Sequence, residues 1–331
     1  ILIPTSLLDI VENFALSTYE FDSNWSNEKN KVIKDKKNVL IFPRYHQLDV
    51  IRKLKIQILN DGVGTNYLVQ HTTGSGKSYE IGWLSFMLIN LFKKNGQDRV
   101  FDSVIVISDR KVLDKQLRET IKSLEQVEGV VEVIDKDSEQ LRKSLSTGKN
   151  IIVTTIQKFS VVVNKIREIE GRTFCVIIDE VHSSQGGKGT KNLQKTLSLN
   201  SEKDDEIDND FMNEEILLIR KEMMYQQKQD HISFIGFTGT PKPQTLEVFG
   251  TLQPDGSKIP FHTYEMKQSI GEGFTLDVLK SFTSVKRYFK LRKTVEDIEV
   301  PEKRVKTELV KWVDSNPETI SRKVSIIIDH L

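Results

Sequence analysis

From Tyr67 onward the sequence alternates short apolar runs with stretches of helical spacing, and this alternation restricts the fold more than any other feature. The runs are rich in valine and isoleucine, as in SVIVIS and FCVIID. Continuous apolar strands separated by helices are typical of a parallel sheet covered on both faces. We therefore predict an α/β fold, with strands at residues 67–70, 103–108, 131–134, 151–156, 174–179 and 233–238.

The regions outside this alternation follow other patterns. Residues 5–16 carry apolar side chains at helical spacing and precede polar sequence, which predicts a helix and then a linker. The acidic stretch within residues 186–230 predicts a surface insertion. Residues 303–331 predict two further helices, and the Asp255–Gly256 pair predicts a hairpin turn.

Composition and charge narrow the class of protein. The apolar runs fall far short of the ~20 residues that span a bilayer, and the N-terminus lacks the basic segment of a signal peptide. A single cysteine among 331 residues excludes an internal disulfide framework and favours the cytoplasm. The net charge of +1 gives no global sign of nucleic-acid binding, and the basic stretches at 27–36 and 285–293 are interpreted as solvated faces.

The sequence HTTGSGKS at residues 71–78 lies between an apolar strand and a predicted helix, which is the setting of a phosphate-binding loop. Glycines let backbone N–H groups turn toward a phosphate, and the helix directs its positive end at the anion. Lys77 would supply a positive charge for the β- and γ-phosphates, and Ser78 a hydroxyl ligand for Mg²⁺. The general pattern has glycine where this chain has His71, so the loop alone is also compatible with a simple glycine–serine turn.

A second candidate segment is FCVIIDEVH, an apolar strand that ends in two carboxylates. Ligands of open α/β sheets bind at the carboxyl ends of the strands. There Asp179 would hold Mg²⁺, Glu180 would polarise the attacking water, and His182 could link the nucleotide to a neighbouring element. Together with the phosphate loop, this segment predicts a site for ATP and Mg²⁺.

A third segment, FIGFTGTPKP, places Thr238, Gly239 and Thr240 after another apolar strand. Small hydroxyl residues at that edge could hydrogen-bond to the loop that begins at Asp179 and sense the nucleotide.

With these segments the chain resembles the motor region of superfamily 2 helicases, and within them the restriction (R) subunit of type I restriction–modification enzymes. The resemblance covers roughly residues 5–331. The stretches that carry it are FPRYHQLDVI, VQHTTGSGKS, VISDRKVLDKQL, IIVTTIQKF, VIIDEVHSSQ, GFTGTP and GEGFTLDVL. One departure is Val181, where the usual box has alanine.

The resemblance implies a role for each matching residue. Gln47 would hydrogen-bond the adenine, and Arg110, Thr155 and Lys158 would face the DNA backbone. Thr238 to Thr240, with His182, would couple hydrolysis to motion. The nucleotide would bind at Thr73, Gly74, Ser75, Gly76, Lys77 and Ser78, with Ser78 and Asp179 as metal ligands and Lys77, Asp179 and Glu180 as catalytic residues.

The resemblance also implies a domain organisation and an activity. Residues 1–40 would be the tail of an upstream nuclease domain and a linker, 41–270 the first RecA-like motor domain, and 271–331 a connector to a second motor domain. We expect this chain to be cut out of a longer protein that translocates double-stranded DNA with ATP, before cleavage. The expected partners are the methyltransferase (M) and specificity (S) subunits, and we expect weak or no activity from the isolated chain.

Several alternatives stay open or are disfavoured. The chain could be another superfamily 2 motor, such as a type III restriction subunit or an RNA helicase, or a module that binds nucleotide without turnover. Pro254–Asp255 and Glu265-x-Lys267 formally match a metal-dependent nuclease core, but so permissive a spacing arises by chance. The six histidines show no metal-ligand spacing, and Cys175 is most simply a core residue.

Overall fold

The computed structural model describes residues 3–26, 31–108, 111–166, 169, 171–181 and 231–277. Two compact units make up the chain, Ile1–Phe274 and Thr275–Leu331. All the described helices and strands belong to the first unit. The predicted insertion, the two C-terminal helices and the second basic stretch lie outside the described residues, as do Arg110 and His182.

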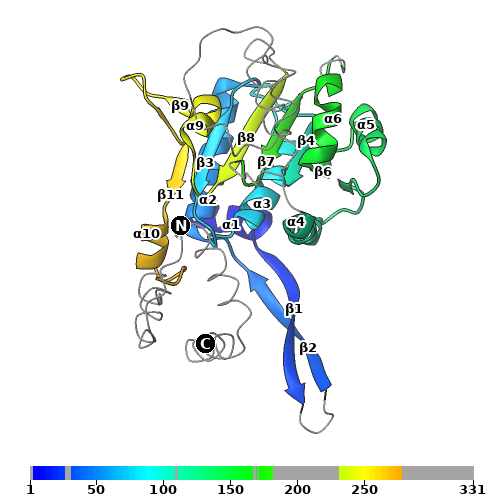
Figure 1. The fold of residues 1–331 in the computed structure, drawn as a ribbon, viewed down its shortest axis with the longest axis vertical. Helices are drawn as coiled ribbons and strands as arrows, with labels where there is room; N and C mark the ends of the chain where they lie inside the picture. The colour runs from blue at the N-terminus through cyan, green and yellow to red at the C-terminus, as the bar shows by residue number, and fades with distance from the viewer. Residues whose placement is uncertain are drawn as a thin grey trace, which may run out of the picture. The chain divides into compact units, whose positions relative to one another are not determined.

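A seven-stranded sheet forms the centre of the first unit (Figure 1), in the order β11-β3-β8-β7-β4-β6-β5. Every neighbouring pair in it is parallel, which confirms the predicted α/β fold. The predicted strands are present as β3 (Tyr67–His71), β4 (Ser103–Ser108), β5 (Val131–Val133), β6 (Ile151–Thr155), β7 (Phe174–Ile178) and β8 (Ile232–Thr238). The edge strand β11 (His262–Tyr264) was not predicted, because its three residues include no apolar run.

Helices cover both faces of the sheet, and alternate residues of each strand point to opposite faces. One face packs against α1 (Pro4–Asn13), α2 (Tyr45–Asp61), α3 (Lys77–Ile89) and α4 (Lys111–Ser123). The other face packs against α5 (Ser138–Thr147), α6 (Ile156–Ile166) and α9 (Pro243–Phe249). In β4, Val104 and Val106 enter the first core while Ile105 and Ile107 enter the second. This double burial explains why the strands are continuously apolar.

The linker predicted after the first helix is wrong. Residues there form β1 (Leu16–Ser26) and β2 (Lys31–Ile41), which pair antiparallel over their whole length. Thr18, Tyr19, Phe21 and Trp25 favour strands, but the charged residues among them concealed this signal at the level of sequence. Backbone hydrogen bonds between two strands do not require an apolar face.

The predicted hairpin turn is confirmed. β9 (Thr251–Leu252) pairs antiparallel with β10 (Lys258–Ile259), and Gly256 between them has a positive φ of 86°. The Asp255 carboxylate accepts hydrogen bonds from the backbone and hydroxyl of Ser257, at 2.9 and 2.6 Å. That carboxylate, half of the formal nuclease pattern, therefore serves the turn. The last described helix is α10 (Met266–Gly271), and none of the described helices is long and apolar enough to cross a membrane.

Candidate nucleotide-binding site

The three candidate segments lie at the carboxyl ends of three adjacent strands. The phosphate loop follows β3, Asp179 and Glu180 follow β7, and Thr238 ends β8, which lies between the other two. Because all three strands are parallel, their carboxyl ends meet at one edge of the sheet. Segments separated by more than 150 residues are thereby brought together at a position where α/β folds bind ligands.

Lys77 joins the phosphate loop to the carboxylates of β7. Its side chain is only 9% exposed, and its Nζ donates to the carbonyl oxygens of His71 and Thr72 at 3.3 and 3.5 Å. The same Nζ lies 3.2 Å from Oε1 of Glu180. An ammonium held at the start of a helix and paired with a carboxylate is well placed to exchange that partner for a phosphate.

Gln47 and Gly76 hold the loop from the side of α2. The Gln47 amide nitrogen donates to the carbonyl oxygens of Ser75 and Gly76 at 3.1 and 3.2 Å, and its oxygen accepts from the backbone N–H of Arg44 at 2.8 Å. Gly76 has φ of 91°, and a Cβ there would lie 2.4 Å from the Gln47 amide nitrogen. Only glycine therefore fits. The adenine contact predicted for Gln47 stays a prediction, since its amide here binds the loop backbone.

Asp179 and Glu180 have unusual environments. Oδ1 of Asp179 is buried and has no hydrogen-bond partner among the described residues. Burial raises the pKa of Asp179 to about 6, the Glu180 carboxylate adds to the rise, and the Lys77 ammonium opposes it. Glu180 has φ of 53°, and no other non-glycine residue in the described ranges has a positive φ. Perturbed carboxyl groups and strained backbone are concentrated at functional sites.

The third segment contacts both of the others. Gly239 lies against the phosphate loop, where a Cβ would lie 3.4 Å from the backbone nitrogen of Thr73. Phe237, which lies in β8 two residues before Gly239, accepts a backbone hydrogen bond from Val181 at 3.1 Å. Thr238 is fully buried, and its hydroxyl accepts from the backbone N–H of Thr240 at 3.2 Å. This segment is thus in position to transmit a change between the loop and Glu180.

The other predicted residues differ in their exposure. Thr73 and Gly74 are exposed at the tip of the loop, Ser75 is buried, and Ser78 is half-buried in the first turn of α3. Of the residues predicted to face DNA, Thr155 is buried at the end of β6. Lys158 donates to the carbonyl oxygen of Ile134 at 2.6 Å. Their role with DNA stays a prediction.

Sequence reasoning missed a buried network beneath the loop. This network explains why His71 stands where the general loop pattern has its first glycine. Nδ1 of His71 lies 2.9 Å from both carboxylate oxygens of Glu80, which is one helix turn after Lys77. His46 stacks on Tyr264 with ring centroids 3.8 Å apart, and burial lowers its pKa. Arg44 lies over the Phe274 ring at 4.3 Å. In the sequence, this network is indicated only by polar residues that occur within otherwise apolar segments.

Comparison with known proteins agrees with this geometry. A profile of the SWI2/SNF2 ATPase family matches residues 46–308. The chain belongs to the SWI2/SNF2 ATPase family. It is a superfamily 2 helicase-type ATPase domain, and it is related to the endonuclease subunits of type I restriction enzymes.

Two curated relatives of this SWI2/SNF2 domain are such subunits. A candidate type I restriction enzyme MjaVIIIP endonuclease subunit of Methanocaldococcus jannaschii is 25% identical over 82% of this chain and 24% of its own length. The HindI endonuclease subunit of Haemophilus influenzae is 26% identical over 83% of this chain and 23% of its own. The chain thus spans about a quarter of either relative. These relatives confirm the resemblance to the motor region of R subunits.

One solved structure of the same class is a fragment of a candidate type I restriction HsdR subunit from Vibrio vulnificus YJ016. It is 17% identical to this SWI2/SNF2 domain, with a TM-score of 0.42, and the match covers 70% of this chain and 32% of that one.

Mg²⁺ fits the donor set at this edge of the sheet. The carboxylate of Asp179 and the hydroxyl of Ser78 are oxygen ligands of the kind that Mg²⁺ prefers. The buried, unpartnered Oδ1 and the raised pKa of Asp179 are what a nearby cation would correct.

Proposed function

We propose that this chain is the first RecA-like motor domain of an ATP-dependent double-stranded DNA translocase, of the kind found in type I restriction R subunits. The observation that carries the proposal is the 3.2 Å pair between Lys77 and Glu180, next to the buried carboxylate of Asp179. Lys77 begins α3 and Glu180 follows β7, so the two groups lie about 100 residues apart in the sequence. Their convergence supports ATP hydrolysis rather than a structural role, because a purely structural ion pair needs neither the strained φ of Glu180 nor a buried, unpartnered carboxylate oxygen beside it.

Each residue of the site would have a separate role in ATP hydrolysis. Lys77 and the backbone of residues 73–78 would bind the β- and γ-phosphates, and Ser78 and Asp179 would hold Mg²⁺. The ion, when bound, neutralises charge on the phosphate oxygens. Glu180 would accept a hydrogen bond from the attacking water and orient it toward the γ-phosphorus. The water oxygen would bond to the γ-phosphorus as the bond from that phosphorus to the ADP oxygen breaks, and the proton of the water would pass to Glu180, giving ADP and inorganic phosphate.

Nucleotide binding would change the pairing of Lys77 and Glu180. Without nucleotide, each neutralises the other. A phosphate would compete for the ammonium, because it carries more charge than a carboxylate, and Glu180 would be released to act on water. Thr238 to Thr240, which lie at the end of the strand bonded to Val181 and approach the loop at Gly239, would carry that change to the rest of the motor.

The domain limits and partners belong to the same proposal. Residues 41–270 would form the motor domain, 1–40 the end of an upstream segment, and 271–331 a connector to a second motor domain. The DNA backbone would be held by Arg110, Thr155 and Lys158, and the whole enzyme would assemble with M and S subunits in the cytoplasm. A second motor domain would supply the arginine that completes the site.

Two alternatives make different predictions. Another superfamily 2 motor would also hydrolyse ATP, but with RNA as its activator. A nucleotide-binding module would bind ATP with Mg²⁺ and release no phosphate, with or without DNA.

The test is phosphate release by the chain, with and without linear duplex DNA or RNA, beside a nucleotide-binding titration. We expect binding that Lys77→Ala abolishes and that Lys143→Ala, at an exposed lysine of α5, leaves unchanged. We expect any turnover to rise with duplex DNA and not with RNA. Absence of nucleotide binding by the folded chain would contradict the proposal.

A further inference from the structure

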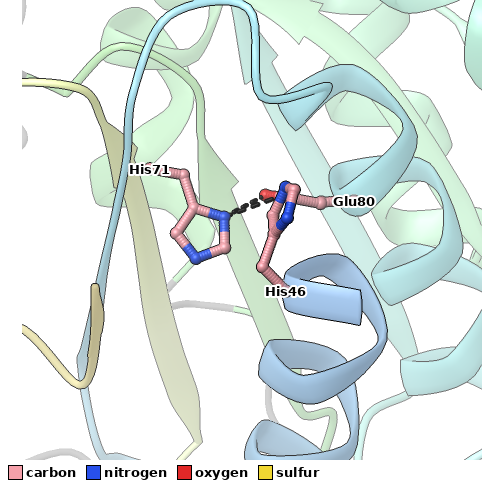
Figure 2. Close-up of side chains that lie close together, drawn as sticks. All are labelled: His46, His71 and Glu80. Atoms are coloured by element: carbon pink, nitrogen blue, oxygen red, sulfur yellow. Dashed lines mark hydrogen bonds and ion pairs between the residues drawn. The ribbon is translucent and has the colours of Figure 1, made fainter. Parts of the chain in front are cut away.

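Three potential metal ligands meet beneath the phosphate loop. Figure 2 shows His46 from the start of α2, His71 from the end of β3 and Glu80 from α3, with the histidine rings directed at the carboxylate. One donor atom from each lies within 4.8 Å of the others. The side chains are 1%, 0% and 0% exposed. This cluster is separate from the groups proposed to bind Mg²⁺, Ser78 and Asp179.

Glu80 needs a positive partner, because an isolated carboxylate buried away from water is very costly. Lys77 is close in sequence but points to Glu180 and to two backbone carbonyl groups. The groups that contact the Glu80 carboxylate in the described residues are the two imidazoles. Either an imidazole carries an extra proton, or a metal cation lies between the rings and the carboxylate.

The hydrogen bonds behind His71 set the number of protons that each option needs. Nε2 of His71 lies 2.8 Å from Nδ1 of His262, and Nε2 of His262 lies 2.9 Å from Asp49. The chain from Glu80 to Asp49 thus has three short contacts, each of which needs one proton. Two neutral imidazoles supply only two. A cation bound by Nδ1 of His71 replaces the third proton, and both remaining contacts are then satisfied by neutral rings.

This arrangement is also the usual support of a metal-binding histidine. Such a ligand donates its other N–H to a polar group, often a carboxylate, which fixes the ring and its tautomer. Here His71 would donate to His262, and His262 to Asp49.

The distances suit a tetrahedral ion. Zn²⁺ binds nitrogen and oxygen at about 2.0–2.2 Å, so neighbouring ligand atoms lie about 3.4 Å apart. The observed separations are 2.9 Å from His71 to Glu80 and 3.6 Å from His46 to Glu80. The carbonyl oxygen of Ser75, 3.1 Å from Nε2 of His46, is in reach as a fourth ligand.

We propose that His46, His71 and Glu80 bind a divalent transition-metal ion such as Zn²⁺, which braces the phosphate loop. The site joins α2, β3 and α3, and Gln47, next to His46, holds the loop backbone. Because every ligand is buried, the ion enters as the chain folds. Its role is structural, since no position on it is open to water.

The test uses Co²⁺ as a spectroscopic substitute for Zn²⁺. The chain is refolded from denaturant with Co²⁺ and without nucleotide, and freed of excess metal. We expect stoichiometric metal with the intense visible bands of four-coordinate Co²⁺. Glu80→Gln and His46→Gln should weaken binding at least about 100-fold, and Asp49→Asn about 10- to 100-fold. His231→Gln is the control, because that half-buried histidine lies outside the cluster.

Four results would overturn the proposal. A folded wild-type chain that retains neither Co²⁺ nor Zn²⁺ would mean that a proton occupies this position. Equal binding by the cluster variants, or loss of metal in the His231 control, would place the ion elsewhere. If a cluster variant does not fold, X-ray absorption of the zinc-loaded wild type decides: two imidazole ligands are expected, and an oxygen-only shell would refute the site.

Discussion

Nζ of Lys77 and Oε1 of Glu180 lie 3.2 Å apart, although one residue begins α3 and the other follows β7. The pair spans β8, the strand between β3 and β7, and Glu180 reaches it with a positive φ. Because removing two charges from water offsets much of their attraction, a largely buried ion pair is weak evidence for a stabilising role. The pair is significant because it places two groups of opposite charge together at one edge of the sheet. Each group can be substituted and tested separately.

Glu180→Gln should preserve ATP binding and abolish turnover. The amide keeps the shape of the side chain but cannot accept the proton of the attacking water, so we expect phosphate release to fall about 10²- to 10⁴-fold. ATP affinity should stay equal or increase, because Lys77 loses its competing partner. A nucleotide titration and a phosphate-release assay on the full-length enzyme measure both. Glu139→Gln, in an exposed ion pair with Arg142, is the control. Normal hydrolysis by Glu180→Gln would mean that another residue accepts the proton of the attacking water.

Gly76→Ala should destabilise the protein and prevent nucleotide binding. The new Cβ would collide with the Gln47 amide, 2.4 Å away, and the residue would keep a φ of 91°. Gly129→Ala is a matched control, since Gly129 has φ of 92° and nothing within 4 Å of its added Cβ. The control isolates the cost of the backbone conformation, about 1–2 kcal/mol. We expect Gly76→Ala to lower the free energy of unfolding, measured with denaturant, by at least about 1 kcal/mol more. Equal losses would mean that Gln47 moves aside freely.

The parts of the fold that depend on local pattern were predictable from the sequence. Runs such as SVIVIS are buried on both faces, so their composition directly reflects their place in a parallel sheet. The loop at Gly76 and the carboxylates at Asp179 and Glu180 were predicted as one site because the two segments occur together in one sheet pattern, although each alone is compatible with an ordinary turn. The order of strands was not predictable, because it depends on contacts between residues far apart in the chain.

The network beneath the loop was not predictable for a related reason. His46, His71 and His262 are dispersed in the sequence, and their spacing matches no metal-binding pattern. Only the parallel pairing of β11 with β3 places His262 near His71. The hairpin was missed because β1 is rich in uncharged polar residues and β2 in charged ones, a composition more typical of a linker.

Asp179 should make the nucleotide-free protein less stable as pH rises through the range from about 4 to 6. Its pKa is raised from 3.8 to about 6, so the folded state binds a proton more tightly than the unfolded state. The free energy of unfolding therefore falls as pH rises between these values. One pKa unit corresponds to about 1.4 kcal/mol, and partial solvent screening should reduce the total to about 1–2 kcal/mol.

Denaturant unfolding from pH 4 to pH 7, with chelator and without nucleotide, measures this dependence on pH. Asp179→Asn carries no titrating group and should remove that part of the slope, while Asp98→Asn, at an exposed turn, should not. A wild-type slope that Asp179→Asn leaves unchanged would show that Asp179 titrates in its ordinary range.

His71→Gly would restore the first glycine of the general phosphate-loop pattern, yet we expect it to destabilise this protein. It removes a hydrogen-bonding partner of the fully buried Glu80 carboxylate, and leaving a buried polar group without its partner costs about 1–3 kcal/mol, more when the group is charged. The double variant with Glu80→Leu should be more stable than His71→Gly alone, because the uncompensated carboxylate is gone. Denaturant unfolding of both single variants, the double variant and the wild type gives the coupling energy between the two residues. Additive effects would mean that His71 and Glu80 act independently, and that the departure at residue 71 has no compensating partner in α3.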